Sequence, residues 1–174
     1  MKKIEDYIRT IPDYPEPGIM FRDITTVVQD PEGLKLAIDS LQKDIEGLDF
    51  DVIVGAESRG FVFGMPLAYN LGKGFVMVRK KGKLPAETIE ETYDLEYGKA
   101  TIEIHKDAIT PGQRVVIIDD LMATGGTVEA VVKLVERLGG KVVHISFLLE
   151  LAGLKGRERL KDYEISSVVA YPGK

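Results

Sequence analysis

Cysteine is absent from this 174-residue sequence, and only two histidines are present, His105 and His144. Without cysteine the chain can form neither a disulfide framework nor a thiolate metal site, and it has no thiol nucleophile. Two histidines this far apart in sequence also argue against a histidine-rich metal site. We therefore assign His105 and His144 structural roles.

Long apolar runs and an excess of positive charge are missing as well. No stretch approaches the roughly 18 apolar residues of a transmembrane helix, and the first residues, MKKIEDYIRT, contain no apolar signal-peptide core. These absences favour a soluble, cytoplasmic protein without a membrane partner. The formal net charge is −5, which is the wrong sign for general binding to nucleic acid. Any anionic substrate must therefore be held by a local basic cluster.

The composition that remains is typical of one globular domain. Hydrophobic residues make up 44% and charged residues 29% of the chain, which suits a single domain with a sizeable core. Short β-branched runs predict strands at 51–55, 75–79, 114–119, 141–149 and 165–171. Amphipathic segments predict helices at 31–48, 60–71, 128–138 and 154–160. This alternation indicates an α/β fold, with a central, mostly parallel twisted sheet flanked by helices, in a single domain spanning 1–174.

Two segments depart from the alternation. Residues 2–11 carry apolar side chains at helical spacing before Pro12, so we expect a helix there and an ordered loop over 12–23. Residues 80–100 are polar, contain Pro85 and two glycines, and alternate only weakly. We expect a long mobile excursion with some hairpin character, because loops of this length in compact domains are usually functional lids or disordered segments.

The clearest chemical signal is the segment 115–127, which reads VVIIDDLMATGGT. An apolar strand ends in two carboxylates, Asp119 and Asp120, and a turn of small residues then opens a helix. Small residues let backbone N–H groups approach an anion, and the helix N-terminus adds the positive end of its dipole. The turn at 123–127 is therefore predicted to bind a terminal phosphate at the carboxyl edge of the sheet, where α/β folds place ligands.

The paired aspartates beside this turn would repel a phosphate, so they are predicted to face something else. A ribose diol, or a Mg²⁺ ion held by that diol and a pyrophosphate, suits them. The alternative reading of the turn is a nucleotide-binding turn of another kind or a capped helix start. The segment lacks the lysine of a GxxxxGK phosphate loop and the spacing of a GxGxxG dinucleotide motif.

These thirteen residues resemble the phosphoribosyl pyrophosphate (PRPP) motif of the type I phosphoribosyltransferases. The resemblance covers nearly the whole chain, is closest to the members that act on adenine, and is carried further by residues 17–23, 58–61, 79–85, 95–99 and 154–158. It implies the fold of that family, with a small base-binding hood over residues 1–30 and a flexible lid over 80–100. It also implies a Mg²⁺ cofactor and a homodimer.

The resemblance also implies which residues contact the phosphate groups and the ribose. The 5′-phosphate would be held by Ala123, Thr124, Gly125, Gly126 and Thr127. Asp119 and Asp120 would hold the ribose hydroxyls and, directly or through water, Mg²⁺. The implied pyrophosphate contacts are Glu57, Ser58, Arg59, Arg79, Lys80 and Lys83. Arg59 would act in catalysis as a charge-assisted donor, the Glu57–Ser58 peptide would be strained or cis, and Lys81 is better read as solvated.

For the base, the resemblance implies that Phe21 stacks on the ring while the backbone from Met20 to Arg22 reads its edge. Leu151 would cover the other face. Closure of the lid would bring Glu96 and Tyr97 over the reacting centre and exclude water. Glu96 is then the candidate general acid/base for the imidazole proton of the purine.

The activity implied is a purine-salvage reaction, in which adenine and PRPP give AMP and pyrophosphate. Ala123 favours adenine, because enzymes for 6-oxopurines commonly carry an acid at that place of the motif. Two alternatives stay open. One is a phosphoribosyltransferase for a 6-oxopurine or another base, and the other is a regulatory module that binds PRPP without turning it over.

Overall fold

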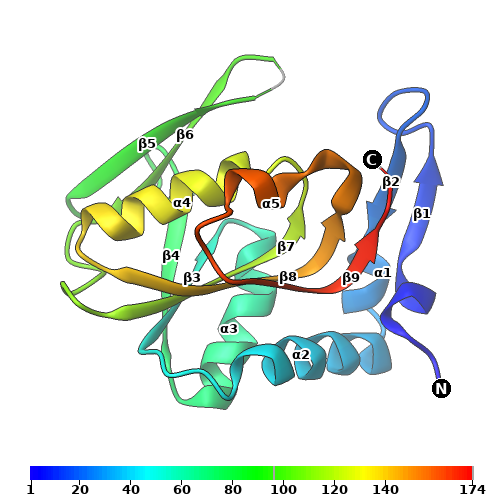
Figure 1. Cartoon of the computed structure of the whole chain (residues 1–174), viewed down its shortest axis with the longest axis horizontal. Coiled ribbons are helices and arrows are strands. Elements are labelled where there is room, and N and C mark those ends of the chain that lie inside the picture. The colour runs from blue at the N-terminus through cyan, green and yellow to red at the C-terminus, as the bar shows by residue number, and fades with distance from the viewer. Residues whose placement is uncertain (96, 174) are drawn as a thin grey trace.

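A computed structural model describes residues 1–95 and 97–173, and its centre is a seven-stranded twisted sheet (Figure 1). The strand order is β5-β6-β4-β3-β7-β8-β9. The strands are β3 (Val52–Ala56), β4 (Gly74–Lys80), β5 (Thr88–Asp94), β6 (Lys99–His105), β7 (Arg114–Met122), β8 (Lys141–Leu151) and β9 (Ile165–Tyr171). Strands β4, β3, β7, β8 and β9 pair in parallel, whereas β6 is antiparallel to both of its neighbours. The expected α/β fold with a mostly parallel sheet is confirmed.

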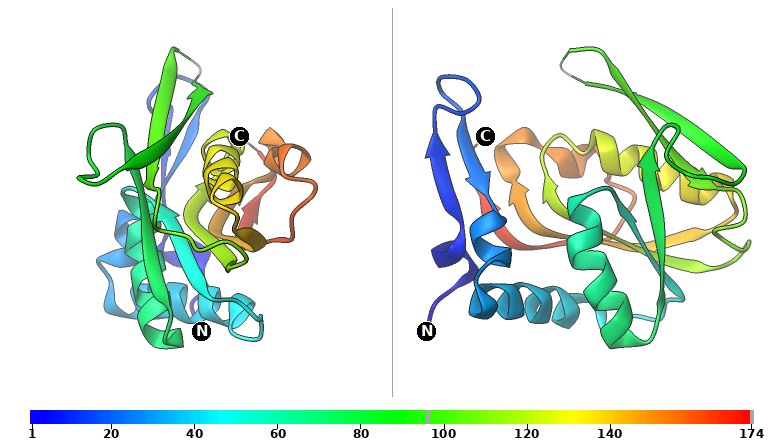
Figure 2. Two further views of the ribbon diagram at one scale, coloured as in Figure 1. Left: turned by 90° about the vertical axis from the view of Figure 1, so that its left-hand side faces the viewer. Right: turned by 180° about the vertical axis from the view of Figure 1, so that it is seen from behind.

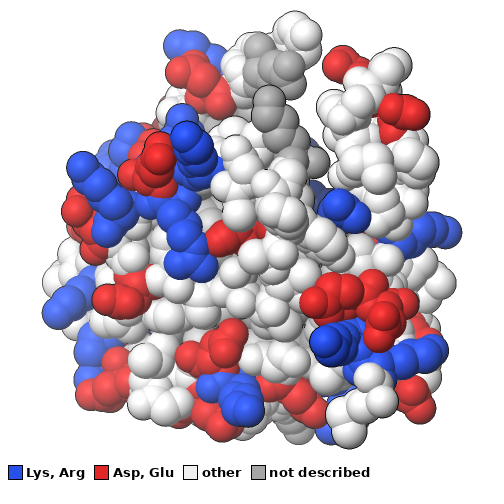
Figure 3. All heavy atoms as spheres, turned by 45° about the vertical axis from the view of Figure 1, so that its right-hand side comes forward, with Lys and Arg blue, Asp and Glu red and all other residues white. Residues whose placement is uncertain are grey.

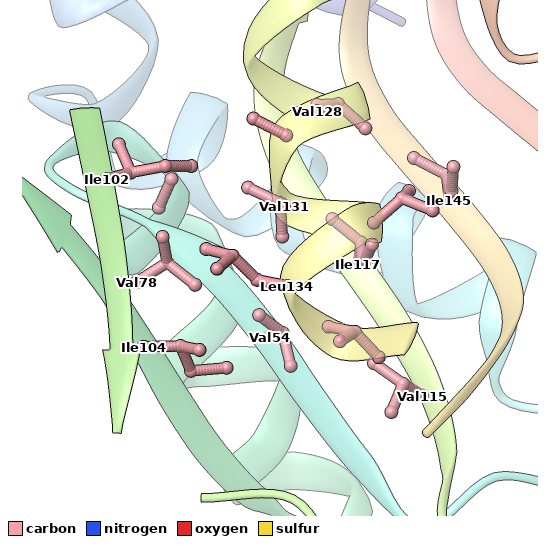
Figure 4. Packing of buried hydrophobic residues seen from close by; sticks show 14 of the residues in the cluster. Val54, Val78, Ile102, Ile104, Val115, Ile117, Val128, Val131, Leu134 and Ile145 are labelled. Atoms are coloured by element: carbon pink, nitrogen blue, oxygen red, sulfur yellow. The ribbon is translucent and has the colours of Figure 1, made fainter. Parts of the chain in front are cut away.

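Helices cover both faces of this sheet (Figure 2). On one face α2 (Pro31–Ile45) and α3 (Arg59–Leu71) bury side chains such as Leu41 and Phe63 against β3, β7 and β8. On the other face α4 (Gly126–Arg137) packs Val128, Val131 and Leu134 against the same central strands, as Figure 4 shows. Because successive residues of a strand face opposite sides, the buried runs of β3 and β7 serve two cores at once.

The helix boundaries follow from local signals in the sequence. The Asp30 side chain accepts hydrogen bonds from the backbone N–H groups of Glu32 at 2.9 Å and Gly33 at 3.0 Å, and Pro31 is the first residue of α2. This capping satisfies donors that the first helical turn leaves without partners. None of the described helices is both long enough and apolar enough to cross a membrane.

The N-terminal segment corrects one expectation. Residues 2–11 do not form a helix: they contain a 3₁₀ turn, η1 (Ile4–Tyr7), and the strand β1 (Arg9–Pro12). Strand β1 pairs antiparallel with β2 (Met20–Asp23), which lies inside the expected loop, and α1 (Thr25–Val28) follows. The reason is tertiary, since the backbone of 9–12 finds its partners in 20–23 rather than within a helix. This separate hairpin lies within the expected hood of residues 1–30, is called the hood from here on, and stands at the right of Figure 1.

The excursion at 80–100 proves to be mainly regular structure. Strands β5 and β6 form an antiparallel hairpin at the edge of the main sheet, paired from Thr88 with His105 to Asp94 with Lys99. The expected hairpin character is thus confirmed, and only 81–87 lies outside strands at the start of the segment. Bonds within the hairpin's base fix that start, because the Glu103 carboxylate accepts from the Gly82 N–H at 2.5 Å and the Thr88 hydroxyl at 2.6 Å. These two bonds lower the pKa of Glu103.

Candidate active site

Loops following three parallel strands meet at the carboxyl edge of the sheet. They follow β3, β7 and β8, which are consecutive in the sheet order. A cavity of about 300 Å³ opens there. It is lined by Ala56, Glu57, Arg59, Tyr93, Asp119, Asp120, Leu121, Met122, Ala123, Thr124, Gly125, Gly126, Thr127 and Val128. The segment that carried the clearest chemical signal therefore forms most of the wall.

The bend at 123–126 presents the start of a helix to this cavity. Gly125 has a φ of 87°, in the left-handed region, and precedes the first residue of α4. A side chain at Gly125 would be strained by that φ and would also stand 3.2 Å from the carbonyl oxygen of Gly156. No side chain in the described ranges, 1–95 and 97–173, caps the N-terminus of α4 at this position. The free N–H groups and the positive end of the helix dipole thus suit an anion.

The two aspartates lie within β7 and not at its end, because the strand continues to Met122. Asp120 is 4% exposed and its Oδ2 lies 3.0 Å from Nε of Arg59. The Asp119 Oδ1 accepts a hydrogen bond of 2.8 Å from the Asp120 N–H. Burial, followed by the nearby charge of Asp120, raises the pKa of Asp119 well above its ordinary value. Two carboxyl groups therefore lie side by side on the cavity wall, and a cation bound there would favour the ionised form of Asp119.

The loop after β3 places a cation against this acid pair. The Glu57–Ser58 peptide is cis, as the resemblance implied, and Arg59 begins α3. Gly60 allows a close approach, because a Cβ there would lie 3.4 Å from the Asp119 carboxylate and 3.2 Å from the carbonyl of Ile118. The backbone thus brings Arg59 and the two aspartates together from segments about sixty residues apart.

Glu57 faces β4 and orients the basic residues at its end. Its Oε1 accepts the Arg79 Nε–H at 3.2 Å and the Lys80 backbone N–H at 2.7 Å. Lys80 lines a second cavity of about 650 Å³, which shares Ala56, Glu57, Tyr93 and Thr127 with the first cavity. Lys81 also lines this second cavity and forms a 3.2 Å ion pair with Glu90. Lys83 is not among the described residues that line either cavity.

The expected base-binding residues lie outside the smaller cavity, in the hood and at the end of β8. Met20, Phe21 and Arg22 belong to β2, and Phe21 packs edge-on against Tyr14 with ring centroids 5.1 Å apart. The Arg22 guanidinium lies over the Tyr171 ring at 4.0 Å, and Tyr171 is the register partner of Leu151. The hood is therefore attached to the same edge of the sheet as the bend at 123–126.

The sequence predicts two lid residues, Glu96 and Tyr97, and the structure places a further residue of the hairpin, Tyr93, at the cavities. Glu96 lies outside the described residues. Tyr97 is 82% exposed and lines neither cavity in this structure. Tyr93, which no sequence motif singled out, lines both cavities, and its hydroxyl accepts a 3.3 Å hydrogen bond from the Thr127 hydroxyl. The only sequence signal for Tyr93 is the alternation in 88–94, which points every second residue towards the same side.

Charged residues on the face shown in Figure 3 include both signs, with basic side chains gathered beside acidic ones. The positive charge of Arg59 is therefore a local feature and not part of a generally positive surface. The site combines a helix N-terminus, an acid pair and a cation at one edge of an α/β sheet. This arrangement can hold a sugar phosphate, with the anion at the helix and the hydroxyls at the carboxylates.

Comparison with known families agrees with this geometry. The model of the phosphoribosyl transferase domain matches residues 24–171. The chain belongs to that family. Its expected type I phosphoribosyltransferase fold is shown, and the hood corresponds to the small antiparallel sheet outside the main one.

Individual phosphoribosyltransferases resemble the chain over its full length. The adenine phosphoribosyltransferase of Lachnoclostridium phytofermentans is 67% identical over 174 residues, which is 100% of both chains. The crystal structure of the Thermoanaerobacter pseudethanolicus enzyme of the same name is 56% identical with a TM-score of 0.93, covering 97% of this chain and 98% of that one. The Saccharomyces cerevisiae enzyme, crystallised with an imino-altritol bisphosphate and adenine, is 40% identical with a TM-score of 0.89, covering 95% and 96%.

Proposed function

We propose that the chain transfers the 5-phosphoribosyl group of PRPP to adenine, giving AMP and pyrophosphate. The observation that carries this proposal is the bend before α4, without a side-chain cap among the described residues, beside the Asp119–Asp120 pair in one cavity. The names of the similar enzymes support the choice of adenine, and the yeast relative was crystallised with adenine. Both alternatives, another base and a regulatory module, are possible outcomes of an assay with a panel of bases.

The 5′-phosphate would lie against the bend formed by Ala123, Thr124, Gly125, Gly126 and Thr127. Backbone N–H groups at the start of α4 would donate to its oxygens, and the hydroxyls of Thr124 and Thr127 would add two donors, the second by turning away from Tyr93. The ribose would extend towards β7, where Asp119 and Asp120 would accept hydrogen bonds from its two hydroxyls. Because Asp120 is already oriented by Arg59 at 3.0 Å, it needs little rearrangement to do so.

Pyrophosphate would lie on the side of the cavity formed by the loop after β3 and the end of β4. Arg59 would donate to it directly, and Glu57 would hold Arg79 and the Lys80 backbone in position through the bonds already present. Ser58 and Lys83 complete the proposed set. The positive charges aimed at the departing group would stabilise the charge that develops on its oxygens, and stabilisation of this kind is usually the main source of rate enhancement.

A Mg²⁺ ion fits the donor set of this site. Carboxylate oxygens are the ligands it prefers, and it commonly takes only one or two of them together with water and substrate phosphates. Asp119 and Asp120 would hold it, directly or through water, and the described residues contain no group of three or more acidic or histidine side chains that would enclose it. When bound, such an ion neutralises charge on the pyrophosphate.

The base would enter between the hood and the end of β8. Phe21 would stack on one face of adenine, the backbone of Met20 to Arg22 would pair with its edge, and Leu151 would cover the other face. The contact of Arg22 with Tyr171 at 4.0 Å supports this assignment, because it ties β2 to the strand that pairs with Leu151. Backbone donors and acceptors suit adenine, whose amino group lies beside a ring acceptor.

The reaction would be a displacement at C1 of the ribose. The bond from C1 to the pyrophosphate oxygen breaks, pyrophosphate leaves with the electron pair, and a base nitrogen forms the new bond from the opposite face. Arg59 would stabilise the leaving group. Glu96 would take the imidazole proton that the base loses, and Tyr97 would help to exclude water when the hairpin closes.

We also propose that the chain acts as a homodimer through an exposed apolar stripe on α3. Val62, Met65 and Tyr69 lie at spacings that share one helix face, and Tyr69 is 86% exposed. Met77 of β4 is exposed as well. Exposed apolar patches of this kind mark interaction sites. Sedimentation equilibrium should give a dimer for the parent chain and a monomer for Tyr69→Asp; a monomeric parent would contradict the proposal.

The test of the proposed function is a panel of labelled bases with PRPP and Mg²⁺. Adenine should be converted to AMP, while hypoxanthine, guanine, xanthine and orotate should react far more slowly. Turnover of another base in place of adenine would favour the first alternative. Stabilisation of the fold by PRPP without turnover of any base would favour a regulatory module.

A further inference from the structure

Arg159 stands over the phosphate-binding bend from a neighbouring element. It is the last residue of the short helix α5 (Gly156–Arg159), which lies beside α4 in Figure 1. Its Nη1 is 2.9 Å from the point that a Cβ on Gly126 would occupy. Thr124 Oγ1 and the Tyr93 ring are each 3.9 Å from the same point. The guanidinium therefore lies against Gly126, the first residue of α4.

Close backbone packing determines this position. Gly156 is buried, and a Cβ there would lie 2.7 Å from the carbonyl oxygen of Ala123. From the other side, a Cβ on Gly125 would lie 3.2 Å from the carbonyl oxygen of Gly156. Leu160, directly after α5, is fully buried in the core under α4. Since both glycines allow contact at backbone distance, α5 packs directly against the bend.

The charge of Arg159 has no counter-charge in the described part of the chain. Its neighbour Arg157 differs, because its Nε donates to both carboxylate oxygens of the buried Glu150, at 2.7 and 2.9 Å. Arg159 forms no ion pair and no side-chain hydrogen bond with any described residue. A cation beside the N-terminus of α4 is disfavoured by the helix dipole. An anion bound between the two removes that repulsion.

We propose that Arg159 is a binding residue for the terminal phosphate of the ribose 5-phosphate group. The inference rests on the proposed function, since it concerns the same substrate. Guanidinium groups match phosphate oxygens with two parallel hydrogen bonds, and such charge-assisted bonds are stronger than neutral ones. A side chain at position 126 would take up space that the Arg159 guanidinium occupies in this structure.

The experiment measures AMP and adenosine affinity by titration calorimetry for the parent chain, Arg159→Gln and Lys161→Gln. Lys161 is exposed two residues further on and gives a matched loss of one positive charge. We expect Arg159→Gln to weaken AMP binding by about 10-fold or more and to leave adenosine binding unchanged, because adenosine lacks the phosphate. Arg159→Lys should recover part of the affinity, and Lys161→Gln should bind both ligands like the parent.

Each outcome bears on a different claim. If the parent chain binds no AMP, the proposed function and this inference both fail. If the parent binds AMP and Arg159→Gln binds it equally well, only the role of Arg159 is refuted. An equal loss of AMP and adenosine affinity in Arg159→Gln would assign the residue a structural role and would also overturn the inference. Thermal melts of each variant establish that it is folded.

Discussion

Replacing Asp120 by asparagine separates catalysis from folding. Asp120 is 4% exposed and faces the cavity, so its carboxylate can accept from the ribose hydroxyls where an asparagine amide does so more weakly. A hydrogen bond to a charged group contributes about 1.5–3 kcal/mol, which corresponds to about 10- to 150-fold in rate. We therefore expect kcat/KM for PRPP to fall by about 10- to 150-fold in Asp120→Asn.

The same change should affect stability little. Asparagine has nearly the same shape, and the partner of Asp120, Arg59, has a side chain that is 54% exposed and can turn to solvent. Screened pairs of this kind contribute about 0–1 kcal/mol, or at most about 4 °C in Tm for a chain of this size. Steady-state kinetics with varied PRPP and a thermal melt measure the two effects.

Asp51→Asn is the matched control at the opposite end of the sheet. Asp51 accepts two side-chain hydrogen bonds from Arg114, at 3.1 and 2.9 Å, far from the carboxyl edge. This variant should lower Tm and leave kcat/KM unchanged. If Asp120→Asn keeps the kinetics of the parent chain, or if its loss of activity follows its loss of stability, the assignment of Asp120 to the ribose is refuted.

Three further predictions concern the lid, the hairpin and acid stability. Glu96→Gln should lower kcat and leave PRPP affinity nearly intact, and unchanged turnover would exclude Glu96 as a proton carrier. Tyr93→Phe removes the acceptor of the Thr127 hydroxyl and should change KM for PRPP by a few-fold with KM for adenine unchanged; equal changes in both would contradict this. Hydrogen bonds from Arg114 lower the pKa of Asp51 to about 2. The stabilisation from the Asp51 carboxylate is present above about pH 4 and is lost as pH falls through 2. Thermal melts at decreasing pH should therefore show a smaller loss of Tm for Asp51→Asn than for the parent chain.

The sheet and the cavity-lining segment at its carboxyl edge could be predicted because their signals are local. The buried run before Asp119, the small residues of 123–127 and the capped start at Asp30 each depend on neighbours within a few positions. The resemblance then supplied roles that no local pattern contains. Base recognition is an example, since a single phenylalanine such as Phe21 would by itself be taken for an ordinary core residue.

The parts that could not be predicted depend on contacts between distant segments. The spacing of Ile4, Tyr7, Ile8 and Ile11 fits a helix, yet 9–12 pairs with 20–23 in the hood. The strand predicted over 114–119 continues to Met122 in β7, because it pairs with β8 there, although its last residues are not β-branched as the first ones are.

Tyr93 and Arg159 were missed for the same reason. Each reaches the bend from an element more than thirty residues away from Gly126, through the hairpin in one case and α5 in the other. Neither residue belongs to a motif with a chemical meaning of its own. Only the packing of those elements against α4 reveals that the two side chains lie at the site.

The central claim is that the bend before α4 anchors the sugar phosphate. A crystal structure of the chain with AMP measures this directly. We predict that the phosphate lies within hydrogen-bond distance of the backbone N–H groups of 124–127, with the ribose hydroxyls at Asp119 and Asp120. AMP bound elsewhere, or a bend that stays empty at saturating AMP, would contradict the account.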